Sequence, residues 1–172
     1  MVEYKELERA LLARMFRQGI IDANTFQSRV TALGFSPDDT FLMLKLEKIE
    51  AAKTVAWVGS PEPVSGVLGG YEKKEITSPV FSISGAGYVV IKGVGSPPAA
   101  TREAIKFYQL DSVGAIIDTF QGPYLGVGET FEYSMGVKPG AVSARVAIFY
   151  WVSNELSHPF TSHTITVYEV IV

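Results

Sequence analysis

The chain has 172 residues, of which 47% are hydrophobic and 19% charged, and its formal net charge at pH 7 is −3. This balance is typical of a folded protein with a sizeable core and excludes an intrinsically disordered chain. Basic residues are not in excess, so nucleic acid is not expected as the primary partner. The chain contains no cysteine, which excludes disulfides and thiolate metal sites.

The character of the sequence changes near residue 54. Residues 1–54 contain two of the sixteen glycines and one of the nine prolines. The remainder contains the other glycines and prolines, which separate short runs typical of β-strands. We therefore divide the chain into a helical docking or oligomerisation element, residues 1–54, and an antiparallel β-sandwich domain, residues 55–172.

Three helices are predicted in the first part. The first covers about residues 3–18, and the second covers 23–33 with Asp22 as its N-cap. The third helix begins after Ser36, which is suited to the N-cap, with Pro37 at the first helical position. It runs to about residue 53.

The third helix is apolar on more than one side, which a small helical element alone cannot cover. We therefore expect it to be buried against the β-domain or against another chain. The predicted interface residues are Phe41, Leu42 and Leu44.

The helical part also resembles known families over residues 7–40. A helix is followed by Gly19-Ile20-Ile21-Asp22 and then by Phe26 in the next helix, a pattern that resembles the helical hairpin called the short C-terminal (SHOCT) domain. Here the hairpin is N-terminal, which departs from the family. The continuation Leu33-Gly34-Phe35-Ser36-Pro37-Asp38-Asp39 resembles helical segments in structural proteins of tailed phages. Both resemblances imply an oligomerising or docking role and no enzymatic activity.

Eight to ten short strands are expected after residue 54. Two hairpins are predicted, one pairing 64–68 with 72–77 across Gly69-Gly70 and the other pairing 104–110 with 113–119. The fold class is α+β by segments, with an antiparallel sandwich of jelly-roll or immunoglobulin-like type. The long loops favour the jelly roll.

The last two predicted strands are the most apolar. Residues 142–152 alternate so that Val146 and Ile148 share a face, and we expect this strand to be central. Residues 163–172 are apolar on both faces, so we expect a strand that is paired within a sheet and covered on both sides.

No catalytic residue, cofactor or metal site is predicted. His158 and His163 are the only histidines, and we expect both on the surface at a loop-to-strand junction. A metal pair with Glu155 is the alternative. No Gly-x-Ser-x-Gly motif occurs, so nucleophilic hydrolysis lacks its usual signature.

Aromatic residues suggest a ligand platform. Tyr124 lies in a glycine-rich loop, and Trp151 shares one face of its strand with Phe149. Aromatic platforms bind sugar rings, so Tyr124 and Trp151 are the candidate residues of a glycan site. A sandwich core built from aromatic residues explains the same pattern.

The sequence therefore predicts a non-enzymatic structural or assembly protein, such as a capsid, decoration or spike component of a virion, that self-associates. The expected partners are further copies of the chain or other structural proteins. A carbohydrate-binding β-sandwich module, stabilised by calcium in one version, is the alternative. Residues Met1–Glu6 are too charged for a signal peptide. The sequence has no apolar run of 18 residues, so we expect no membrane span. The expected location is the virion or, for a protein that is not viral, the cytoplasm.

Overall fold

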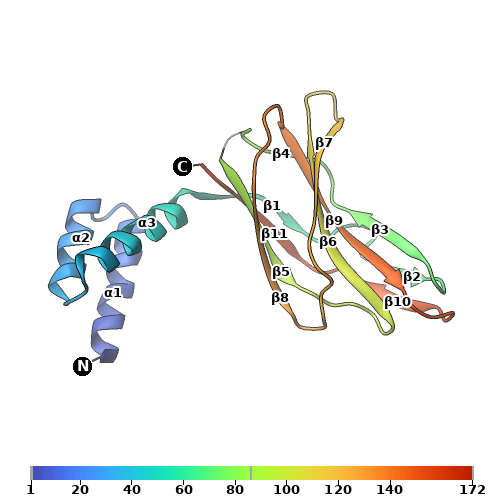
Figure 1. Cartoon of the computed structure of the whole chain (residues 1–172), viewed down its shortest axis with the longest axis horizontal. Coiled ribbons are helices and arrows are strands. Elements are labelled where there is room, and N and C mark those ends of the chain that lie inside the picture. The colour runs from blue at the N-terminus through green and yellow to red at the C-terminus, as the bar shows by residue number, and fades with distance from the viewer. Residues whose placement is uncertain (1, 86, 172) are drawn as a thin grey trace. The chain divides into compact units, whose positions relative to one another are not determined.

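The computed structural model describes residues 2–85 and 87–171 (Figure 1). The chain forms two compact units that meet in sequence between Lys53 and Thr54. The first contains three helices, and the second contains antiparallel strands in packed sheets. The predicted α+β class with a β-sandwich is thus confirmed. Within the described residues, no helix has the length and apolar character needed to cross a membrane.

The helical unit consists of α1 (Val2–Arg17), α2 (Ala23–Ala32) and α3 (Pro37–Ala52). The predicted N-caps are confirmed, because the Asp22 side chain accepts a hydrogen bond from the backbone N–H of Thr25 and the Ser36 hydroxyl accepts one from Asp39. Gly34 follows α2 with a φ of +92°, a left-handed conformation that glycine adopts without strain.

The core of the helical unit is small. Its buried side chains are Leu12, Ala13, Phe26, Val30 and Leu44. Half-buried aromatic residues, Phe16 and Phe35, pack around them. Each helix contributes to this cluster, so the three helices hold one another together through a single apolar core.

The β-unit contains eleven strands among the described residues: β1 (Lys53–Gly59), β2 (Ser65–Leu68), β3 (Lys73–Thr77), β4 (Phe81–Ser82), β5 (Tyr88–Val94), β6 (Thr101–Leu110), β7 (Ile116–Gln121), β8 (Thr130–Gly136), β9 (Ser143–Val152), β10 (His158–Thr161) and β11 (Ile165–Val170). One sheet has the order β1-β11-β5-β8, and the other has the order β3-β9-β6-β7, with β4 also pairing with β9. A separate ribbon joins β2 to β10.

This strand order is that of a jelly roll. When β2, β4 and β10 are set aside, the eight main strands numbered along the chain form sheets 1-8-3-6 and 2-7-4-5. The first main strand pairs with the last, and successive strands cross repeatedly between the sheets, which is the winding of two Greek keys. The structure thereby decides between the two predicted topologies.

The sandwich core lies between the inner faces of the two sheets (Figure 1). Ile148 on β9 lies opposite Ile105 on β6, and Val146 lies opposite Phe107. All four side chains are fully buried. The prediction that residues 142–152 form a central strand with Val146 and Ile148 inside is confirmed, since β9 lies between β3 and β6.

The predicted hairpin across Gly69-Gly70 is wrong. β2 pairs with β10, and β3 pairs with β9. The chain between them passes from the ribbon to the second sheet, and the backbone N–H of Tyr71 donates to the carbonyl of Asn154. Gly69 and Gly70 therefore lie in a connection between two different sheets and not in a two-residue hairpin turn. The second predicted hairpin is real, although its turn spans residues 111–115.

Candidate functional site

The outer face of the β3-β9-β6-β7 sheet gathers cations and aromatic rings. Because side chains alternate along a strand, every second residue of each strand reaches this face. We call this surface the cation–aromatic face and define it by Lys73, Arg102, Lys106, Tyr108, Tyr124, Arg145, Phe149 and Trp151, together with Glu75.

One row of this face contains both predicted platform residues. The Nζ atom of Lys73 lies 4.5 Å from the centre of the Trp151 ring, and the guanidinium carbon of Arg102 lies 5.2 Å from it. The same Arg102 carbon lies 5.4 Å from the Tyr124 ring. Arg102 therefore joins Tyr124 to Trp151, and the row alternates cation and ring at distances suited to cation–π attraction.

Strand register explains this row. Lys73 of β3 and Arg102 of β6 are both paired with Trp151 of β9. Tyr124 reaches the row because its neighbour Leu125 forms an isolated bridge with Glu103. The glycine-rich loop 122–129 is thus attached to the edge of β6 beside the row.

In the adjoining part of the face, Glu75 is paired with Lys106 and Tyr108. Glu75 accepts a hydrogen bond from Lys106 at 3.0 Å and one from the Tyr108 hydroxyl at 2.6 Å. Burial raises the pKa of Tyr108, and the hydrogen bond to Glu75 raises it further. Lys106 also lies over the Phe149 ring, and Arg145 lies over Tyr108.

A second polar arrangement lies inside the sandwich. Glu103 is on the inner side of β6 and is fully buried. Its carboxylate lies 2.7 Å from Nε2 of His163 and also accepts a hydrogen bond from the backbone N–H of Ser96. A buried carboxylate needs such partners because its desolvation is costly. The pair links β6 to the segment that leads into β11.

Several polar atoms of this pair, of Tyr150 opposite Glu103 and of Ser162 beside His163 are unpartnered. In the described part of the chain, Glu103 Oε2, His163 Nδ1, Tyr150 OH and Ser162 Oγ are buried and have no hydrogen-bond partner. Burial raises the pKa of Tyr150, and the negative charge of Glu103 adds to the effect. The cluster lies in the interior, so it is a structural feature and not an exposed reactive site.

The two histidines are not brought together. Nε2 of His158 lies 2.8 Å from the side-chain oxygen of Asn154, whereas His163 is paired with Glu103. The expectation of a surface position is wrong for His163, whose side chain is 13% exposed. No group of three metal-ligating side chains occurs among the described residues.

The predicted interface residues of α3 differ in exposure. Leu44 belongs to the core of the helical unit, whereas Phe41 and Leu42 are about half exposed. Leu46 is exposed as well, one turn beyond Leu42. Leu44 is therefore satisfied within its own unit, and an interface on α3 remains a prediction for Phe41 and Leu42.

α1 carries an exposed apolar stripe, whereas the sequence-based prediction of an interface named residues of α3 only. Tyr4, Leu7 and Leu11 are 69%, 72% and 55% exposed. At 3.6 residues per turn they lie on the side of the helix opposite the buried Leu12 and Ala13. We call these three residues the α1 stripe.

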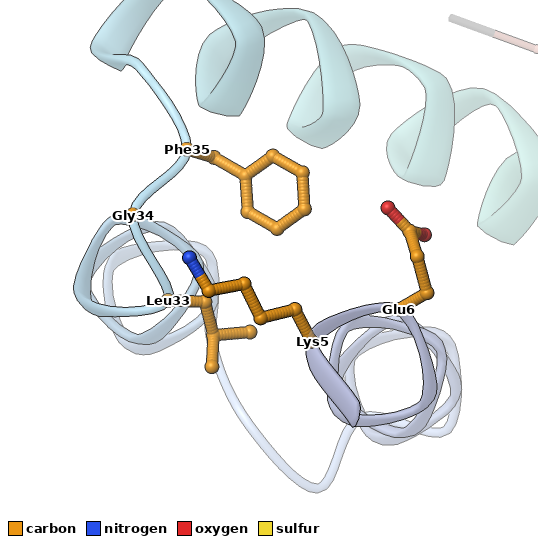
Figure 2. Close-up of a pocket in the computed structure, with 5 residues that line it drawn as sticks. All are labelled: Lys5, Glu6, Leu33, Gly34 and Phe35. Atoms are coloured by element: carbon orange, nitrogen blue, oxygen red, sulfur yellow. The ribbon is translucent and has the colours of Figure 1, made fainter. Parts of the chain in front are cut away.

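A shallow pocket also lies in the helical unit (Figure 2). Figure 2 shows the Lys5 side chain extending from α1 toward Gly34, with Phe35 and Glu6 on the α3 side. A Cβ atom at Gly34 would lie 3.1 Å from Lys5 Nζ, so this wall is closely packed. The pocket is a packing feature between α1 and the α2–α3 connection.

Comparisons with known proteins identify no family. No family model matches this chain, and no curated protein sequence matches it. Similar solved structures include the VP2 subviral particle of infectious bursal disease virus, with 12% identity and a TM-score of 0.47, covering 69% of this chain and 33% of that chain. The enzymatically active domain of tailspike protein 4 of bacteriophage CBA120 has 16% identity and a TM-score of 0.44, covering 70% of this chain and 19% of that chain. This chain thus spans a third or less of the length of both.

Sequence reasoning found Tyr124 and Trp151 but missed the cations between and beside them. The alternation of β6 places Arg102, Lys106 and Tyr108 on one face, so this part of the signal was present. The contribution of Lys73 was not visible, because the partner of β3 was wrongly predicted. Glu103 also has a signal, since it shares inward positions with Ile105 and Phe107.

Proposed function

We propose that this protein is a non-enzymatic structural protein that self-associates through its helical unit, as a capsid, decoration or spike component of a virion. The α1 stripe is the observation that carries the proposal. Three large apolar side chains more than half exposed on one helix are unusual for a surface that faces water alone.

The spacing of the α1 stripe suits a helix from a second copy. Tyr4, Leu7 and Leu11 are separated by three and then four residues, the spacing of a coiled-coil seam. Burial of leucine-sized side chains contributes roughly 1.5–3 kcal/mol each. Leu42 and Leu46 give α3 a second outward apolar stripe. The resemblance of residues 7–40 to SHOCT hairpins and to tailed-phage segments supports the same role.

The β-unit fits a structural role by analogy of fold. Jelly rolls build viral capsids and lectins, and a fold by itself does not decide between functions. In the described chain, both histidine rings are held by Asn154 and Glu103 and neither bonds to a hydroxyl nucleophile. The histidine–nucleophile arrangement of a hydrolase is therefore not formed by these two side chains.

The mass of the protein in solution tests the proposal. Light scattering should give the mass of two or more chains for the natural protein. Leu7→Asp and Leu42→Asp should each lower the mass or weaken association at least about tenfold, because a carboxylate would be buried without a partner. A natural protein that stays a single chain at every concentration would contradict the proposal.

A matched control is available on the same helix. Ala10 is exposed and lies to one side of the α1 stripe. Ala10→Asp introduces the same charge and should leave the mass unchanged. Circular dichroism of each variant checks that the helices remain folded. If Ala10→Asp and Leu7→Asp weaken association equally, net charge and not the stripe would be responsible.

The second candidate function is glycan binding by the β-unit. It is favoured by the row in which Arg102 joins the exposed Tyr124 to Trp151. The two functions use different units and are compatible in one protein.

A further inference from the structure

We infer that the cation–aromatic face binds a carboxylated polysaccharide, with Lys73 and Arg102 as the residues that contact its carboxylates. This inference goes beyond self-association, because it concerns the β-unit and assigns a ligand class to a surface. It rests on the charge of the face, on two cations without carboxylate partners, and on the way those cations occupy the Trp151 ring.

The charge of the face is opposite to that of the rest of the chain. Four basic residues, Lys73, Arg102, Lys106 and Arg145, and one acidic residue, Glu75, give it a net charge of +3. The whole chain has a net charge of −3, so the remainder carries −6. An anionic ligand is therefore attracted to this face and repelled elsewhere.

Two of the four cations are exposed and free to meet an anion, whereas Arg145 is half-buried over the Tyr108 ring. Glu75 neutralises Lys106, but neither Lys73 nor Arg102 has a carboxylate partner in the described part of the chain. Both are exposed. Their distances to the Trp151 ring, 4.5 Å and 5.2 Å, place the two charges within about 10 Å of each other. An extended anion can contact both at once, and the guanidinium fork of Arg102 matches a carboxylate bidentately.

Trp151 favours an acidic sugar over a neutral one. A neutral sugar binds an aromatic platform by stacking on an open ring face. Here Lys73 from β3 and Arg102 from β6 approach the indole from both neighbouring strands. Stacking of a neutral ring would displace a cation, whereas a carboxylate binds to the cations where they stand.

The same arrangement disfavours nucleic acid. Unpaired bases bind by stacking on open aromatic rings, and the Trp151 ring is engaged with cations. A carboxylated polysaccharide needs no open aromatic ring, because its carboxylates bind the cations and its sugar hydroxyls can bond to neighbouring polar groups.

Binding to polygalacturonate tests the inference. Titration calorimetry of the full-length protein should show binding to polygalacturonate that weakens as salt is raised from about 50 to 200 mM, because exposed charges are screened. The fully methyl-esterified polymer has the same sugar backbone without charge and should bind at least about tenfold more weakly. Oligo-deoxythymidine of similar length should also bind more weakly.

Matched variants locate the site. Lys73→Met and Arg102→Met should each weaken polygalacturonate binding about tenfold or more. Lys138→Met removes the same charge from a loop outside the face and should change affinity less than about twofold. Thermal melting shows whether each variant keeps its fold.

The remaining outcomes would overturn the inference. Equal binding of the ester would show that carboxylates are not recognised, and tighter binding of the oligonucleotide would show that the ligand class is nucleic acid. Equal loss in Lys138→Met would place binding elsewhere, and no binding of polygalacturonate would remove the proposed class. A mass that doubles through this face, and falls in Arg102→Met, would identify a second copy as its occupant. None of these results bears on the α1 stripe, which is tested by Leu7→Asp.

Discussion

At the scale of single residues, the interior of the sandwich holds a polar cluster that the apolar core tolerates because its carboxylate is hydrogen-bonded. Glu103 and His163 lie 2.7 Å apart, and the carboxylate also receives a backbone N–H. The Tyr150 hydroxyl beside them has no partner among the described residues. Substitutions of these groups differ in their effect on the free energy of unfolding. Removal of an unpartnered hydroxyl is nearly neutral, whereas removal of one member of a buried pair is destabilising.

Tyr150→Phe should therefore change the free energy of unfolding by less than about 1 kcal/mol at pH 7. The two proteins should differ at high pH. Burial and the charge of Glu103 raise the pKa of Tyr150 above its ordinary value of 10.0. The raised pKa contributes to stability in full below pH 10. Above pH 10 this contribution is lost, because the hydroxyl ionises more easily in the unfolded chain than in the folded one.

Between pH 7 and pH 11 the free energy of unfolding of the natural protein should fall by about 1.4 kcal/mol more than that of Tyr150→Phe, which lacks the ionisable hydroxyl. Urea unfolding at pH 7 and pH 11 measures the difference. Tyr71→Phe is the control, because it removes the same hydroxyl from a side chain that is 65% exposed. Identical alkaline losses in the natural protein and Tyr150→Phe would show that Tyr150 ionises as easily folded as unfolded.

At the scale of elements, β9 organises the second sheet. It pairs with β3 and β4 on one side and with β6 on the other, and its inward side chains are fully buried. Its outward side chains include Phe149 and Trp151. The same strand therefore holds the core together and positions the cation–aromatic face, so a defect in its packing should affect both.

Ile148→Ala should lower the free energy of unfolding by about 2–5 kcal/mol, since it leaves a cavity in the sandwich core beside Ile105. Chemical denaturation monitored by tryptophan fluorescence measures the loss. Ile116→Ala on β7 is the matched control, because Ile116 is 48% exposed and its truncation should cost below about 1 kcal/mol. A loss in Ile148→Ala as small as in the control would mean that β9 is not packed in the core as described.

At the scale of the whole molecule, the jelly roll closes its first strand against its last. β11 lies between β1 and β5, so the C-terminal strand is internal to its sheet. Ile165 and Val167 face the core and are fully buried. The strand cannot fray without exposing two neighbouring strand edges, which would invite aggregation.

Deletion of residues 167–172 should abolish soluble folding of the β-unit, because it removes most of β11, the strand with which both β1 and β5 pair. Soluble yield and thermal melting of the truncated chain measure this. Val167→Asp should have a similar direction of effect, whereas Ile171→Asp, at a residue 51% exposed, should be tolerated. A truncated chain that stays soluble and melts at the same temperature would show that β11 is dispensable.

The sequence by itself determined the local features. The N-caps Asp22 and Ser36, the division near residue 54 and the inward alternation of β9 all depend on neighbours in sequence or on a short period. These features act through backbone hydrogen bonds and side-chain direction within a few residues. They therefore follow from the chain without knowledge of its fold.

Only the tertiary structure decided which distant strands pair, and the candidate sites depend on that. Trp151 meets both Lys73 and Arg102 because β9 lies between β3 and β6, and Glu103 meets His163 across sixty residues of chain. β2 pairs with β10, although Gly69-Gly70 predicted that it would pair with the next strand along the chain. Strand partners are chosen by burial of the whole core, and no local pattern records that choice.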